Sequence, residues 1–220
     1  MANATYQREV INQAGFDMLN LCISQLKKAK EAFVNHDSDL AEEVMNIENR
    51  VNALDLKIEK DCEKFIALYN PVAIDLRFVM AIRKINYDLE RIADHAYGIS
   101  KYVVDVDRKI PDNLISAVDF EKMFDTILAM FDNISDAFEN KNAKSARKVF
   151  KKDKILDEIN VQSFFVIEKE IKNDNSTIAE ALLLFSVVKK LERVGDHIKN
   201  VAEEIIFYID AEVLKHSRKK

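Results

Sequence analysis

Two pairs of acidic residues are spaced as ligands for a cation would be. Glu90 and Asp94 lie four residues apart, and Glu192 and Asp196 repeat that spacing 102 residues later. On an α-helix this spacing places both carboxylates on one face, where two like charges destabilise the helix by roughly 0.2–0.5 kcal/mol. Each pair therefore needs a cation, supplied either by an Arg or Lys side chain or by a bound metal ion.

Both pairs belong to a longer repeated segment. The segments 89–95 (LERIADH) and 191–197 (LERVGDH) are identical at five of seven positions. Between the two acids of each pair, on the same helix face, lies a small residue, Ala93 or Gly195. A small residue leaves space for a ligand to approach the carboxylates, so the repeated segment is the first candidate for a site. His95 and His197 follow the acids by one residue, about 100° around the helix, and are expected to face a neighbouring helix or solvent.

A second set of polar residues repeats at an offset of 105. Glu48 and Asn52 in the first half match Asp153 and Asp157 in the second. If the two helices of each half are antiparallel, these residues can meet the repeated acids across the seam. All-carboxylate ligand sets suit hard cations such as Mg²⁺, Ca²⁺, Mn²⁺ or ferric iron. Because Asn52 is neutral, we expect the second half to bind a metal ion more tightly than the first.

The alternative is that these acids form only interhelical salt bridges. Arg91, Arg193 and nearby lysines are the available cations. Spacing alone favours this alternative, because charged residues on helices are usually solvated or paired. The duplication does not decide between the two readings, since a repeat preserves a structural salt bridge as readily as a metal site.

The composition predicts an all-α fold. The 220 residues include three Gly and two Pro, far below the usual proportions of about 7 % and 5 %, so the chain has little turn chemistry. Apolar residues recur at three- and four-residue spacing over 78–103 and 187–205, as in the seam of a helical bundle. A stripe of Phe and Ile over 120–138 is expected to be core.

These patterns predict six long helices in two tandem three-helix bundles. The expected helices cover residues 6–35, a segment from the polar cluster 36–39 to about 69, 71–104, a segment after 113 that contains the aromatic stripe, 143–172 and 177–210. We expect the polar cluster 36–39 (HDSD) to supply the turn and the cap of the second helix, Asn70 and Pro71 to begin the third, and Thr177 with Glu180 to form a capping box. The domains would be residues 1–106 and 112–212, followed by a basic tail, 213–220.

Charge and apolar content exclude several protein classes. The net charge of −5 argues against nucleic acid as the main partner. The longest apolar run, over 181–188, is far shorter than the roughly 20 residues needed to span a bilayer, and the N-terminus has no apolar signal core. Cys22 and Cys62 are too few for a disulfide framework and indicate reduced, buried thiols. We therefore expect a cytoplasmic protein that is not inserted in a membrane.

The repeated segments, together with Pro71–Arg77 (PVAIDLR), resemble the PhoU family of phosphate-specific transport system accessory proteins. The resemblance covers almost the whole chain and implies two three-helix bundles related by a pseudo-twofold axis. It also implies acidic motifs that hold iron or zinc clusters on the bundle surface. Carried onto this sequence, the ligands it implies are Glu48, Asp75, Glu90, Asp94, Asp153, Asp157, Glu192 and Asp196. Asn52 departs from the family pattern, and Asp75 has no acidic counterpart in the second half.

The resemblance implies a regulator of phosphate uptake and of the phosphate-starvation response. Its partners would be the ATPase subunit of the phosphate ABC transporter and the phosphate-sensing histidine kinase, and the protein would form a homo-oligomer, most simply a dimer. Two rivals are a structural helical adaptor without metal and a di-metal oxidase of the ferritin type. The oxidase uses Glu-x-x-His ligands, whereas Phe33, Ile92, Val194 and Val213 stand three residues before the four histidines. The sequence therefore disfavours the oxidase and indicates a protein that is not an enzyme.

Overall fold

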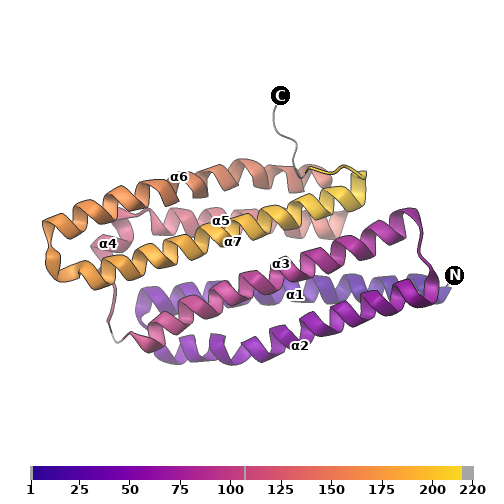
Figure 1. The fold of residues 1–220 in the computed structure, drawn as a ribbon, viewed down its shortest axis with the longest axis horizontal. Coiled ribbons are helices and arrows are strands. Elements are labelled where there is room, and N and C mark those ends of the chain that lie inside the picture. Colours follow the sequence, from indigo (N-terminus) through magenta and orange to yellow (C-terminus); the bar gives the residue numbers. More distant parts are fainter. Residues whose placement is uncertain (1, 107, 215–220) are drawn as a thin grey trace.

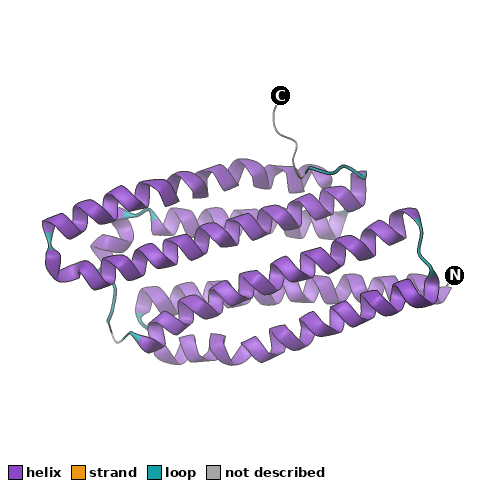
Figure 2. Ribbon diagram, in the orientation of Figure 1, coloured by secondary structure: helices purple, strands orange, loops and turns teal. Residues whose placement is uncertain are grey.

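The computed structural model describes residues 2–106 and 108–214, and these residues form helices joined by short turns (Figure 2). Six long helices make up the two halves. They are α1 (Ala2–Asn35), α2 (Ser38–Tyr69), α3 (Ala73–Asp105), α5 (Phe120–Asn140), α6 (Ala143–Asn173) and α7 (Ile178–Asp210). A short helix, α4 (Asp112–Ala117), precedes α5, and a single 3₁₀ turn, η1 (Asn175–Thr177), precedes α7. The predicted all-α fold with six long helices is confirmed.

The helices form two three-helix bundles that lie side by side along their length (Figure 1). In the first bundle α1, α2 and α3 contact one another, and in the second α5, α6 and α7 do the same. The main contact between the bundles joins α3 to α7, so the two helices that carry the repeated acidic segments are neighbours. The α2–α3 turn and the α6–α7 turn lie at opposite ends of the molecule, as a pseudo-twofold relation requires.

The predicted apolar stripes of both central helices are buried. In α3 they run from Phe78 to Val103 and in α7 from Val187 to Ile205, with each side chain of the stripes at most 4 % exposed. The Phe and Ile stripe of α5 is also core, and Phe138 stacks on Phe16 of the other bundle. The apolar cores of the two bundles are therefore continuous, which fixes α3 and α7 against each other.

Helix caps differ from the sequence expectation at two turns. The cap of α2 comes from the predicted cluster 36–39, in which the Asp37 side chain accepts a hydrogen bond from Leu40 N. Asn70, however, has a left-handed backbone (φ 45°) and ends α2, so α3 begins at Ala73 rather than at Pro71. Asn tolerates this conformation and Pro commonly follows a helix end, which explains why Asn70 and Pro71 end α2 instead of beginning α3. The prediction of a capping box at Thr177 and Glu180 was also wrong. The Thr177 side chain makes no capping hydrogen bond, and the Asp174 side chain instead accepts one from Ser176 N.

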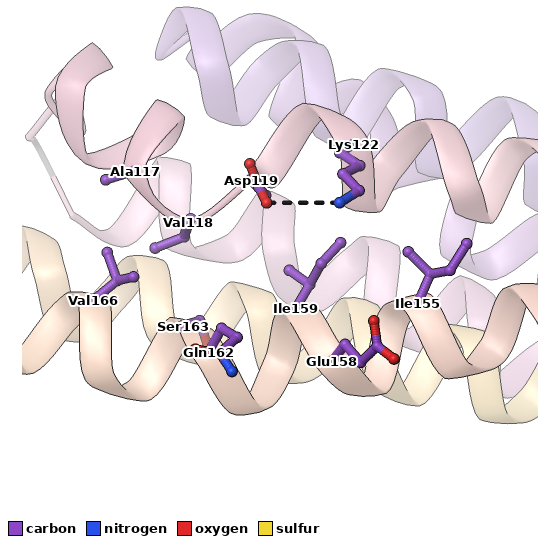
Figure 3. Close-up of a pocket in the computed structure, with 10 residues that line it drawn as sticks. All are labelled: Ala117, Val118, Asp119, Lys122, Ile155, Glu158, Ile159, Gln162, Ser163 and Val166. Atoms are coloured by element: carbon purple, nitrogen blue, oxygen red, sulfur yellow. Dashed lines mark ion pairs between the residues drawn. The ribbon is translucent and has the colours of Figure 1, made fainter.

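The fourth predicted helix is broken after Ala117. The break lies at Val118 and Asp119, where Asp119 has a φ of 54° that a continuing helix cannot accommodate. A pocket of about 200 Å³ lies between this break and α6, lined by aliphatic side chains such as Ile155 and Ile159, with Asp119 and Lys122 at one side (Figure 3). Its lining includes none of the predicted metal ligands among the described residues.

No helix in the described ranges, 2–106 and 108–214, is long and apolar enough to cross a membrane.

Candidate acidic sites

The first acidic cluster forms where α2 and α3 pack together. Glu48 comes from α2, and Glu90 and Asp94 come from α3. Burial raises the pKa of Glu48, and the charge of Asp94 raises it further, while the Asn52 side chain lowers it. Burial also raises the pKa of Glu90, with Asp94 as the strongest neighbouring charge. The predicted meeting of the two helices is therefore present, and the acids repel one another there.

Asp55 is a further member of the first cluster, which the repeated sequence pattern did not predict. Its charge acts on Glu90, and burial raises its own pKa. The Asn86 side chain donates from Nδ2 to Asp55 Oδ1 at 2.6 Å, which ties α3 to α2 at this point. Spacing offered a signal, because Asp55 follows Glu48 by seven residues and so lies on the same face two turns later. The cluster thus has four carboxylates rather than three.

The second acidic cluster has the matching position between α6 and α7. Asp153 is only 7 % exposed, and burial raises its pKa despite the hydrogen bond from Lys199. Burial raises the pKa of Glu192, and the charges of Asp196 and Asp157 raise it as well. The charges of Asp157 and Asp196 therefore act on both Asp153 and Glu192. Asn160, a buried amide, stands where the first half has Asp55.

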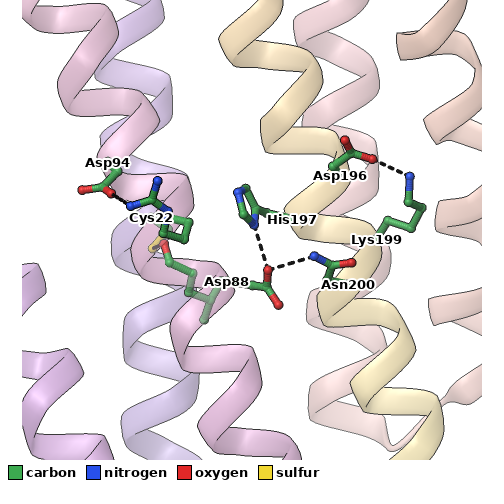
Figure 4. A network of polar contacts seen from close by, with 9 residues as sticks. Cys22, Asp88, Asp94, Asp196, His197, Lys199 and Asn200 are labelled. Carbon is green, nitrogen blue, oxygen red and sulfur yellow. Dashed lines mark hydrogen bonds and ion pairs between the residues drawn. The ribbon is translucent and has the colours of Figure 1, made fainter. Parts of the chain in front are cut away.

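Each cluster contains a basic side chain bound to an acid. In the first, Arg91 Nη1 donates to Asp94 Oδ2 at 2.5 Å, within α3. In the second, Lys199 Nζ lies 2.5 Å from Asp196 Oδ1 of its own helix (Figure 4). It also lies 2.7 Å from Asp153 Oδ2 and so bridges α6 and α7. Burial opposes the charge of Lys199, but these two carboxylates outweigh burial and raise its pKa. Part of each cluster is therefore neutralised internally.

Asp75 lies apart from both clusters. It lies in the first turn of α3, 15 residues before Glu90, which corresponds to about 22 Å along the helix. Its carboxylate Oδ1 lies 3.3 Å from Arg8 Nε of α1. The structure thus gives Asp75 an ion pair in its own half and does not bring it to Glu48, Glu90 or Asp94.

The small residue Gly195 has a packing role. A Cβ at this position would lie 2.3 Å from Leu156 Cδ1 and 3.7 Å from Asp153 Oδ1. Because real Cβ atoms do not approach so closely, Gly195 permits α6 and α7 to pack tightly beside Asp153. The space beside Gly195, predicted to admit a ligand, is filled by Leu156 of α6.

The donor chemistry fits a hard cation better at the first cluster than at the second. Within the described residues, no group of three or more His, Cys, Asp or Glu side chains is arranged so that it could hold a metal ion as it stands. A cation at the first cluster would draw together carboxylates that repel one another. At the second cluster it would meet the Lys199 ammonium. Glu48, Asp55, Glu90 and Asp94 are therefore the residues that would hold a metal ion.

Comparison with known proteins gives a consistent result. Residues 16–103 and 120–205 each match the family described as the PhoU domain. The phosphate-specific transport system accessory protein PhoU homolog of Deinococcus radiodurans is 30 % identical over 202 residues, which cover 92 % of this chain and 93 % of that protein. The PhoU protein of Escherichia coli K12 is 30 % identical over 192 residues, covering 87 % and 79 %.

A solved structure resembles the fold over nearly the whole chain. The crystal structure of PhoU from Pseudomonas aeruginosa superposes with a TM-score of 0.88 at 26 % identity, covering 94 % of this chain and 99 % of that one. Each half of the molecule thus matches one copy of the same domain.

Proposed function

Because this chain belongs to the PhoU family, we propose that it regulates phosphate uptake and the phosphate-starvation response by coupling the phosphate ABC transporter to a sensor histidine kinase. The observation that carries the proposal is the match of both halves to a family whose members are named accessory proteins of phosphate-specific transport. The protein would act in the cytoplasm as a homodimer, without catalysis. It would hold the starvation response off when phosphate is plentiful.

Two exposed apolar surfaces support a coupling role. The first tip, at the α2–α3 turn, consists of Leu68, Val72 and Ile74, and the second tip, near the α6–α7 turn, consists of Phe164, Phe165 and Leu182. Their side chains are between 48 % and 74 % exposed. Beside the second tip is a groove of about 300 Å³, whose lining includes Phe164, Leu182 and Phe185. The two turns lie at opposite ends of the molecule, so the tips could contact two different proteins at once (Figure 1).

The acidic clusters would add a metal-dependent element to this regulator. Four carboxylates on two helices suit Mg²⁺, Mn²⁺, Ca²⁺ or iron, whereas zinc is more often held by Cys and His. A bound cation would relieve the repulsion among Glu48, Glu90 and Asp94 and would clamp α2 to α3.

A second candidate is a helical adaptor whose acids serve only as salt bridges. The ion pairs of Arg91 with Asp94 and of Lys199 with Asp153 and Asp196 favour this candidate. Metal content after purification without a metal-affinity tag separates the two. An adaptor would contain no metal ion, and a metal-dependent regulator would retain one.

The regulatory proposal is tested by deletion and complementation. Deleting the gene should raise phosphate-regulated expression in phosphate-rich medium, and the wild-type chain should restore repression. Val72→Glu and Phe165→Glu, one at each tip, should each fail to restore it and should each lose binding to one of the two partners. Leu56→Glu is the matched control, because Leu56 is 53 % exposed on α2 outside both tips. Unchanged phosphate uptake and expression after deletion would contradict the proposal.

A further inference from the structure

The two acidic clusters are related by the repeat, but only the second has a basic residue three positions after the second acid of its central helix. Three residues after Asp196 in α7 stands Lys199, and three residues after Asp94 in α3 stands Tyr97. The two positions correspond at the offset of 102. An ammonium group is therefore present at a position where the first half has a neutral phenol.

Lys199 has the contacts of a bound cation. Its ammonium group donates to one carboxylate of each helix, Asp153 of α6 and Asp196 of α7. Both are charge-assisted hydrogen bonds, which are roughly twice as strong as bonds between neutral groups. Asp153 is 7 % exposed, and a buried carboxylate requires a positive partner. Lys199 thus provides the charge that a metal ion would otherwise provide.

The local packing supports this arrangement. Gly195 lies one turn before Lys199 on α7, and its missing Cβ permits Leu156 and Asp153 to approach α7 closely. The first half has Ala93 at the matching position. Its basic residue, Arg91, binds Asp94 within the same helix and leaves Glu48 of α2 to face Asp94.

We infer that Lys199 is the resident cation of the second cluster and excludes a metal ion there, so that the chain takes a metal ion at the first cluster alone. The inference rests on the metal-binding part of the proposed function. A metal ion would have to displace an ammonium group that is tethered to the site and therefore present at a high effective concentration. This reverses the ranking expected from sequence, because Asp55 adds a carboxylate to the first cluster and Lys199 neutralises one in the second.

The test is an isothermal calorimetric titration of the purified chain with Mn²⁺ alone. The wild type should bind one equivalent of Mn²⁺. The Glu48→Gln variant should lose this binding, and the Asp157→Asn variant should keep it. Lys199→Met, which keeps the length of the side chain without its charge, should bind a second equivalent. Lys154→Met is the control, because Lys154 is an exposed lysine next to Asp153 on α6, and it should still bind one.

Each outcome decides the inference. Two equivalents in the wild type, or one that Asp157→Asn removes, would overturn it while leaving metal binding intact. No gain in Lys199→Met would also overturn it. If the wild type binds no Mn²⁺ and Lys199→Met binds one equivalent, the exclusion of a metal ion by Lys199 is supported. The same result would overturn the metal ion at the first cluster and with it the metal-dependent part of the proposed function. If Lys199→Met does not fold, the wild type, Glu48→Gln and Asp157→Asn still locate the site.

Discussion

His95 and His197 face each other across the seam between the two halves, with their ring centroids 5.6 Å apart. They are equivalent residues of the two repeats, yet their surroundings have opposite charge. His197 Nδ1 donates to Asp88 Oδ1 at 2.8 Å, and Asn200 donates to the same oxygen (Figure 4). The repeat equivalent of Asp88 is Lys190, whose charge acts on His95. The two histidines thus keep equivalent positions, but the residue beside them is an acid, Asp88, in one repeat and a base, Lys190, in the other.

Other seam contacts follow the same rule. Lys84 of α3 pairs with Glu204 of α7, and at the other end of the seam Tyr102 and Ser186 share a hydrogen bond of 2.8 Å. These two contacts exchange with each other under the 102-residue offset. After duplication, an ion pair at one end of the seam thus corresponds to a neutral hydrogen bond at the other.

We predict that His95 makes the protein less stable in acid. Burial, helped by the charges of His197 and Lys190, lowers its pKa to about 4. Since an unfolded His has a pKa near 6.5, the unfolded state binds one more proton between those values. The free energy of unfolding should therefore fall by about 1.4 kcal/mol per pH unit from about pH 6.5 to about pH 4 because of this residue. Urea unfolding of the wild type and His95→Asn at several pH values measures how the free energy of unfolding depends on pH. An equal dependence in both proteins would contradict the role of His95.

Neutralising one acid of the first cluster should stabilise the metal-free protein. Glu48→Gln preserves the shape of the side chain and removes repulsion with Asp94, so the melting temperature should rise with a gain of a few tenths to about 1 kcal/mol. Glu63→Gln on the exposed face of α2 is the control and should change little. A destabilised Glu48→Gln protein would mean that Glu48 has a favourable partner that outweighs Asp94.

The close approach at Gly195 predicts a packing defect on substitution. Gly195→Ala would force the buried Leu156 side chain out of its position, and the expected loss is about 1–3 kcal/mol. Combining it with Leu156→Val should recover part of that loss, because the shorter side chain gives room. Additive losses in the double variant, measured by chemical unfolding, would show that the two residues do not share this contact.

The helix break at Asp119 predicts a preference for glycine. With a φ of 54°, a residue with a Cβ is strained and glycine is not. Asp119→Gly should be more stable than Asp119→Ala by about 1 kcal/mol, in thermal unfolding of both. The opposite order would argue against a left-handed residue at this turn.

The sequence predicted elements whose signal is local and repeated. The stripe from Phe78 to Val103 alternates at helical spacing, and each side chain of it is buried as expected. It did not predict the break at Asp119, because neither Gly nor Pro marks that position. It reversed the role of Asn70 because the same residue type suits the start and the end of a helix.

The candidate site was predicted less completely for a related reason. Glu90, Asp94, Glu192 and Asp196 were found from spacing within one helix. Asp55 and Lys199 act across helix pairs, and their contacts depend on the register in which α2 meets α3 and α6 meets α7. The helix spacing alone does not determine that register.

The central structural claim is that the two acidic clusters have different cations. Its most direct test is anomalous scattering from crystals of the wild-type chain grown with Mn²⁺. We predict an anomalous peak among Glu48, Asp55, Glu90 and Asp94, with Lys199 still bound to Asp153 and Asp196. A peak between Asp153 and Asp196, with the Lys199 side chain displaced, would contradict it.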